Sequence, residues 1–110
     1  HGFFSPKECR FLQSLNQVLE HTEVEFYHSG DLDYGGIKIF LYIQKNLFPE
    51  LQPLMMDVRT YEQYRDYAEK IEDTTLEKLK KLQIENPVLR QLAEKLVKEK
   101  KGIEQESFLL

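Results

Sequence analysis

The sequence predicts an α/β fold in which two parallel strands, residues 24–30 and 53–57, are flanked by helices and followed by a helical C-terminal part. Three observations lead to this prediction. The chain has 110 residues, which suits a single domain over residues 1–110. Hydrophobic residues make up 41% of it, which is ordinary for a globular protein and excludes wholesale disorder. Helix and strand patterns alternate, and a strand–helix–strand order implies a right-handed crossover with parallel pairing.

The first half of the chain is expected to place one strand between two helices. Residues 5–20 predict a helix, because Ser5 can cap it, Pro6 suits the first helical position and apolar residues follow at helical spacing. The β-branched and aromatic run 24–28 predicts the first strand. Apolar residues at helical spacing predict a second helix over residues 37–48, which a proline then stops.

The second half adds a short strand and three helices. The apolar run 53–57 closes on an acidic residue and predicts the second strand. The expected helix starts are Asp57 or Thr60 for the third helix, Thr74 or Thr75 for the fourth, and Asn86-Pro87 for the fifth. Gly102 is expected to end the fifth helix as a left-handed cap.

The predicted sheet is too small to stand alone. Parallel strands are usually covered on both faces and flanked by further strands, so two of them make a poor sheet. The chain also starts at His1 without a methionine. We therefore expect residues 1–110 to be the C-terminal part of a larger α/β domain whose upstream strands are absent from this sequence.

Two classes of protein are excluded by composition. Cys9 is the single cysteine, so a disulfide scaffold within the chain is excluded. No apolar run approaches the roughly 18 residues of a membrane span, and no signal peptide is visible. We expect a cytoplasmic protein with no membrane contact.

Charge is unevenly placed along the chain. Residues 20–36 carry five acidic residues and no Lys or Arg, whereas residues 75–101 have a net charge of +4. An acidic cluster in a protein that also has a basic stretch fits a cation-assisted phosphate site beside a nucleic-acid surface. The alternative is that the basic stretch is the solvated face of two helices.

The acidic turn after the first strand is the candidate site. Asp31 and Asp33 are two residues apart, so they share a face if the strand persists, at the strand end where open α/β sheets bind ligands. Paired carboxylates suit a hard divalent cation used for phosphoryl chemistry. Gly35 and Gly36 could let a substrate phosphate approach backbone N–H groups where the next helix begins. Alternatively, Asp31 and Asp33 provide only a turn and a helix cap.

Other candidate residues carry weaker signals. Asp57 ends the second strand and could be a further ligand or a helix cap, while Glu104 and Glu106 form a second acidic pair near the C-terminus. His28 on the first strand is expected to pack. The tyrosines at helical spacing, Tyr61, Tyr64 and Tyr67, are expected to pack or to form a stacking surface.

The segment Phe26-Tyr27-His28-Ser29-Gly30-Asp31-Leu32-Asp33-Tyr34-Gly35-Gly36 resembles the metal-binding strand, turn and helix of the Toprim domain. It is most similar to the nuclease subunits of Wadjet anti-plasmid systems, the JetD-like group. The run 53–57 resembles that group's next strand, Gly102-Ile103-Glu104-Gln105-Glu106 its C-terminal acidic segment, and Gly2-Phe3-Phe4-Ser5 its helix entry. The resemblance therefore spans nearly the whole chain.

The resemblance implies a partial Toprim, Rossmann-like domain of a Mg²⁺-dependent DNA endonuclease that cleaves plasmid DNA in prokaryotic defence. Asp31 and Asp33 map onto the family's catalytic metal ligands, with Mg²⁺ or Mn²⁺ as the cofactor, and Glu104 and Glu106 map onto its C-terminal acidic pair. The implied partners are double-stranded DNA and condensin-like motor subunits, and a homodimer is left open. No residue here matches the Glu on the first Toprim strand, so the chain alone is expected to be inactive. The alternatives are a non-catalytic protein- or DNA-interaction module and a topoisomerase-related subunit.

Overall fold

A computed structural model of the chain describes residues 25–108. The helix expected at residues 5–20 and Cys9 lie outside the described residues. In chain order the elements are β1 (Tyr27–His28), α2 (Tyr34–Asn46), β2 (Gln52–Pro53), α3 (Val58–Gln63), the 3-10 turn η1 (Arg65–Tyr67), β3 (Glu69–Lys70), α4 (Asp73–Lys81), α5 (Pro87–Glu99), β4 (Lys101–Gly102) and the 3-10 turn η2 (Gln105–Ser107). The result is a small mixed α/β domain with a parallel strand pair, as the sequence predicts.

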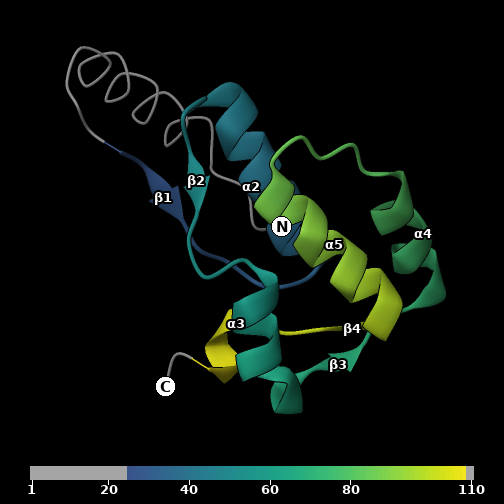
Figure 1. Cartoon of the computed structure of the whole chain (residues 1–110). Helices are drawn as coiled ribbons and strands as arrows, with labels where there is room; N and C mark the ends of the chain where they lie inside the picture. The colour runs from purple at the N-terminus through teal and green to yellow at the C-terminus, as the bar shows by residue number, and fades with distance from the viewer. Residues whose placement is uncertain (1–24, 109–110) are drawn as a thin grey trace.

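The parallel pair is shorter than expected. β1 pairs with β2 in parallel, with Tyr27 opposite Gln52 and His28 opposite Pro53. Figure 1 shows the two strands side by side at one edge of the helices. The first predicted strand, 24–30, extends beyond β1 on its C-terminal side, and residue 24 lies outside the described residues. The second, 53–57, starts one residue late and shares only Pro53 with β2. At the second strand, Met55 adopts a left-handed conformation with φ 56°, which breaks an extended run.

A second strand pair was not predicted. β3 and β4 pair antiparallel, with Glu69 opposite Gly102 and Lys70 opposite Lys101. These strands have two residues each and mostly exposed polar side chains, so they carry no hydrophobic alternation. The pair brings the end of α5 back to the segment that follows α3.

The end of α5 corrects one expectation. Lys100 takes the left-handed position with φ 59°, and its N–H donates to the carbonyl of Leu96 at 2.8 Å. Gly102, expected to be this cap, lies in β4 instead. A Cβ at residue 102 would come within 3.1 Å of the Leu32 carbonyl oxygen and of the Asp33 Cβ. The glycine is therefore explained by close packing against the acidic turn.

The helices pack around α5, which contacts α2, α3 and α4 (Figure 1). The buried apolar residues come from helices α2 to α5, from the acidic turn (Leu32) and from the C-terminal segment (Ile103). The fully or nearly fully buried ones with the largest side chains are Tyr61, Phe40, Leu32, Ile37, Met56, Leu89, Leu92, Leu96 and Ile103. Among residues 25–108, no helix is long and apolar enough to cross a membrane.

Capping bonds confirm the predicted helix starts at Asp57 and Asn86, and they also confirm the alternative role of Asp33 as a helix cap. The side chain of Asp33 accepts from Gly36 N, that of Asp57 from Thr60 N, and that of Asn86 from Val88 N and Leu89 N. Capping by Asp33 starts α2 at Tyr34, three residues before the expected position. α4 starts at Asp73, one residue before the first of its two expected starts. α3 ends at Gln63, and the 3-10 turn η1 follows it.

Asn86→Ala is expected to lower the free energy of unfolding by about 1 kcal/mol, because two N–H groups at the start of α5 lose their acceptor. Denaturant unfolding of the two proteins measures this. Asn86→Asp is the matched control and should stay close to the wild type, since aspartate caps as well as asparagine. Equal stability of all three proteins would contradict the capping role.

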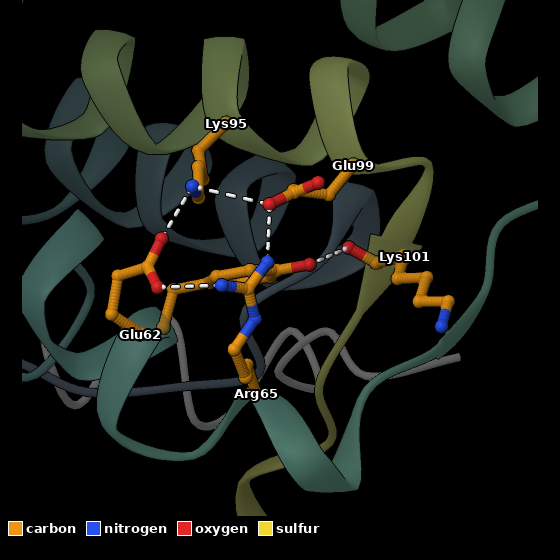
Figure 2. A network of polar contacts seen from close by, with 6 residues as sticks. Glu62, Arg65, Lys95, Glu99 and Lys101 are labelled. Carbon is orange, nitrogen blue, oxygen red and sulfur yellow. Dashed lines mark hydrogen bonds and ion pairs between the residues drawn. The ribbon is translucent and has the colours of Figure 1, made fainter.

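Four charged side chains connect α3 and η1 to α5 (Figure 2). Lys95 pairs with Glu62 and, at 3.2 Å, with Glu99; Arg65 pairs with Glu62 at 3.0 Å and with Glu99. The hydrogen bonds from Lys95 lower the pKa of the Glu62 and Glu99 carboxyls. Lys95, in the middle of the basic stretch, is therefore committed to an internal network that fixes the end of α5 just before β4.

The tyrosines at helical spacing are used differently. Tyr61 is buried, and its hydroxyl donates to the Lys101 carbonyl at 3.0 Å, which further fixes β4. Tyr64 stacks on Phe108 with the ring centroids 4.4 Å apart. Tyr67 is 54% exposed. Packing is confirmed for the first two, and the three rings do not form one exposed stacking surface.

Candidate functional site

The acidic turn joins β1 to α2. The Asp33 backbone is extended, with φ −154°, and its carboxylate Oδ1 accepts a hydrogen bond from Gly36 N at 2.7 Å. This bond satisfies one of the N–H groups that a helix start leaves without a partner. Asp33 therefore caps α2, which is one of the two roles that its sequence context indicates.

Asp31 is held by a segment far away in the sequence. Its Oδ1 accepts from the backbone N–H of Gln105 at 2.7 Å. Leu32, the next residue, exchanges two backbone hydrogen bonds with Ile103, of 2.8 and 2.9 Å. Leu32 and Ile103 are both completely buried. The acidic turn and the C-terminal segment are therefore pinned together over a buried apolar pair.

Gly36, in the first turn of α2, lies very close to the backbone of the acidic turn. A Cβ at residue 36 would lie 1.9 Å from the Asp31 carbonyl oxygen, so no side chain fits there. Gly35 is exposed, and a Cβ there would meet only Asp33 Oδ1, at 3.5 Å. Because Asp33 already uses the Gly36 N–H, the two glycines are not equivalent as a phosphate site.

The carboxylates repel one another. Burial raises the pKa of the Asp33 carboxyl, the negative charges of Asp31 and Glu104 raise it further, and the hydrogen bond from Gly36 opposes this. The C-terminal segment thus brings a third acidic residue within electrostatic reach of the turn. A bound cation would relieve the repulsion.

Asp31 and Asp33 are two carboxylates and do not by themselves form a closed cage for a metal ion. Within residues 25–108, no three His, Cys, Asp or Glu side chains lie close enough together to hold an ion. Mg²⁺ is typically bound by one or two carboxylates, with water and substrate phosphate completing its shell. Asp31 and Asp33 each use Oδ1 in the bonds above, and each carries a second carboxylate oxygen.

The remaining candidates lie around this turn without joining it closely. Asp57 accepts from Thr60 N at 2.7 Å, so its capping role is confirmed. Glu104 and Glu106 are exposed, before and within η2. His28 is half-buried with its ring centroid 6.1 Å from that of Phe40, and burial lowers its pKa. The expected packing of His28 is confirmed.

Sequence reasoning missed Gln105 and Ser29. Gln105 Nε2 donates to Ser29 Oγ at 2.6 Å, next to the bond between Gln105 N and Asp31. The available signal was the position of Gln105 between two acidic residues, in a segment that resembles a family motif. A polar contact across 76 residues has no periodicity that a single sequence could reveal.

Asp33→Asn is expected to stabilise the metal-free protein relative to the wild type at neutral pH. Near pH 3.5 we expect this gain in stability to be smaller. The folded-state pKa of Asp33 is raised, so its contribution to stability is complete below roughly pH 4 and is lost as the pH rises through the folded value. Asparagine keeps the cap and removes the charge. Thermal unfolding in EDTA across this range measures the difference, and a difference independent of pH would contradict it.

Comparisons with known proteins give a consistent result. A family model described as "Wadjet protein JetD, C-terminal" matches residues 8–109. A curated relative, "Wadjet protein JetD" from Bacillus cereus (strain Q1), is 44% identical over 108 residues, and the match covers 96% of this chain and 26% of the relative. The chain therefore spans about a quarter of the length of that relative. No solved structure matches the chain.

Proposed function

The chain belongs to the family of Wadjet JetD C-terminal domains, and from this premise we propose that it is the Toprim portion of a Mg²⁺-dependent nuclease that cleaves plasmid DNA. The observation that carries the proposal is the pair of carboxylates, Asp31 and Asp33, at the end of a parallel strand and the start of a helix. Strand ends of this kind are where open α/β sheets bind ligands.

The chain's own residues would divide the work as follows. Asp31 and Asp33 would hold the ion, which in such sites activates water and stabilises the leaving oxygen of a phosphodiester. Gln105 N–H and Gly36 N–H fix one oxygen of each carboxylate and so restrict its rotation. The negative charge of Glu104 acts on Asp33 and raises the pKa of its carboxyl. Gly35, exposed at the start of α2, leaves room for a phosphate near the positive end of the helix.

The activity is proposed for the full-length protein and not for these 110 residues alone. In Toprim domains a Glu on the first strand serves as acid, base or further ligand, and no residue of this sequence matches it. As in other proteins that contact the DNA backbone, we expect little sequence preference. We propose double-stranded DNA and condensin-like motor subunits as the partners, with the motor selecting the DNA.

A cleavage assay tests this function. The full-length protein, with and without its motor subunits, is incubated with supercoiled circular DNA in Mg²⁺, Mn²⁺ or EDTA. We expect nicked or linear products that require the metal. No cleavage under any of these conditions would overturn the nuclease proposal and favour an interaction module, in which Asp33 and Asp57 serve only as helix caps.

A further inference from the structure

Gln105 contacts the acidic turn through two separate groups. Its backbone N–H donates to Asp31 Oδ1 at 2.7 Å, and its side-chain Nε2 donates to Ser29 Oγ at 2.6 Å. Gln105 and Ser29 are both partly buried, whereas the neighbours Glu104 and Glu106 are exposed. The side chain of Gln105 thus reaches Ser29, at the start of the turn, while its backbone N–H holds the Asp31 carboxylate.

The fold does not need these two bonds to keep the C-terminal segment in place. Ile103 is completely buried and exchanges two hydrogen bonds with Leu32, and Gly102 is paired with Glu69 in the β3–β4 ladder. Loss of a partly buried side-chain bond at residue 105 would leave this apolar and backbone anchoring intact. The hydrogen bonds of Gln105 instead set the orientation of the Asp31 carboxylate and of the backbone that follows Gln105.

We propose that Gln105 is a positioning residue for the metal site. Its side chain, anchored on Ser29, sets the Gln105 N–H on Asp31 Oδ1. The inference rests on the proposed function, because it assigns Gln105 a role toward the cation of that site. A partner that orients a metal-binding carboxylate typically changes metal affinity by about 10- to 100-fold when it is replaced.

Mn²⁺ binding to the full-length protein, measured by isothermal titration calorimetry without DNA, tests the inference. The variants are Gln105→Met, which keeps the length and removes the amide, Ser29→Ala, and the two combined. Gln91→Met is the matched control, since Gln91 is exposed on α5. We expect Mn²⁺ affinity about tenfold weaker in Gln105→Met and in Ser29→Ala, with no further loss in the double variant, because both remove the same bond.

Thermal unfolding of each variant separates positioning from folding. Unfolding midpoints close to that of Gln91→Met, together with weaker Mn²⁺ binding, support the inference. Unchanged Mn²⁺ affinity in Gln105→Met, or a loss of affinity that only follows a loss of stability, overturns it. If Gln105→Met does not fold, Ser29→Ala decides by the same two measurements.

An Asp31→Asn and Asp33→Asn arm separates this inference from the proposed function. If Mn²⁺ binding disappears in the Asp31→Asn and Asp33→Asn variants but is unchanged in Gln105→Met, the role of Gln105 is overturned and the proposed function stands. Absence of any Mn²⁺ binding that depends on Asp31 and Asp33 overturns both proposals.

Discussion

Asp31→Asn and Asp33→Asn are each expected to abolish metal-dependent DNA cleavage by the full-length protein. The loss should exceed about 100-fold, the upper end of the effect of replacing a residue that only supports a metal ligand. Asparagine keeps the shape of the side chain and can still accept the bonds from Gln105 N–H and Gly36 N–H. It removes a negative charge that strengthens the binding of a hard cation.

Asp57→Asn provides the matched control for this assay. Asp57 also follows a parallel strand and also caps a helix, through Thr60 N, so the same substitution there makes the same chemical change. We expect cleavage by Asp57→Asn to equal that of the wild type. Full activity in Asp31→Asn or Asp33→Asn would remove that residue from the mechanism, and loss of activity in Asp57→Asn would assign Asp57 to the site.

Gly36→Ala is expected to destabilise the protein by about 3 kcal/mol or more, at the upper end of the cost of overpacking. Alanine in place of glycine normally stabilises a helix by up to about 1 kcal/mol. Here the added Cβ would lie 1.9 Å from the oxygen and 2.7 Å from the carbon of the Asp31 carbonyl. Because these are backbone atoms, the acidic turn itself must move away from α2.

Gly35→Ala separates this clash from the general effect of a glycine substitution. A Cβ at residue 35 would meet only Asp33 Oδ1, at an ordinary 3.5 Å, so we expect stability equal to or slightly above that of the wild type. Denaturant unfolding of the full-length protein compares the two variants. Equal stabilities of Gly35→Ala and Gly36→Ala would contradict the close approach described here.

Local signals predicted the parts of the fold that depend on local chemistry. Asp57 and Asn86 cap the helices that they were expected to start, and Asp33 takes the capping role that was its alternative, because each cap acts on N–H groups two or three residues away. The parallel strand pair also follows from the order of elements. Its length did not, since Met55 adopts a left-handed conformation that its residue type does not favour.

The missed features all depend on contacts between distant residues. Gly102 has the sequence context of a helix cap, yet its small size serves the packing against Leu32 and Asp33. β3 and β4 are short and polar, so nothing in either stretch indicates its partner. The bond between Gln105 and Ser29 is of the same kind. For the candidate site, the sequence indicated which residues bear the chemistry but not which ones hold them in place.

The hydrogen bond between Gln105 and Asp31 determines when, during synthesis of the chain, the acidic turn can become ordered. Asp31 and Gln105 are 74 residues apart, so a growing chain on the ribosome completes the turn long before it contains the segment that orders it. Domains emerge N-terminal end first, at roughly 5–20 residues per second, and contacts of high sequence separation form late. The Asp31 carboxylate of a nascent or truncated polypeptide therefore lacks the partner that orders it, whereas Asp33 can already cap α2 through Gly36 N. In the synthesis of this chain, the hydrogen bond that holds Asp31 can therefore form only after Gln105 has been translated.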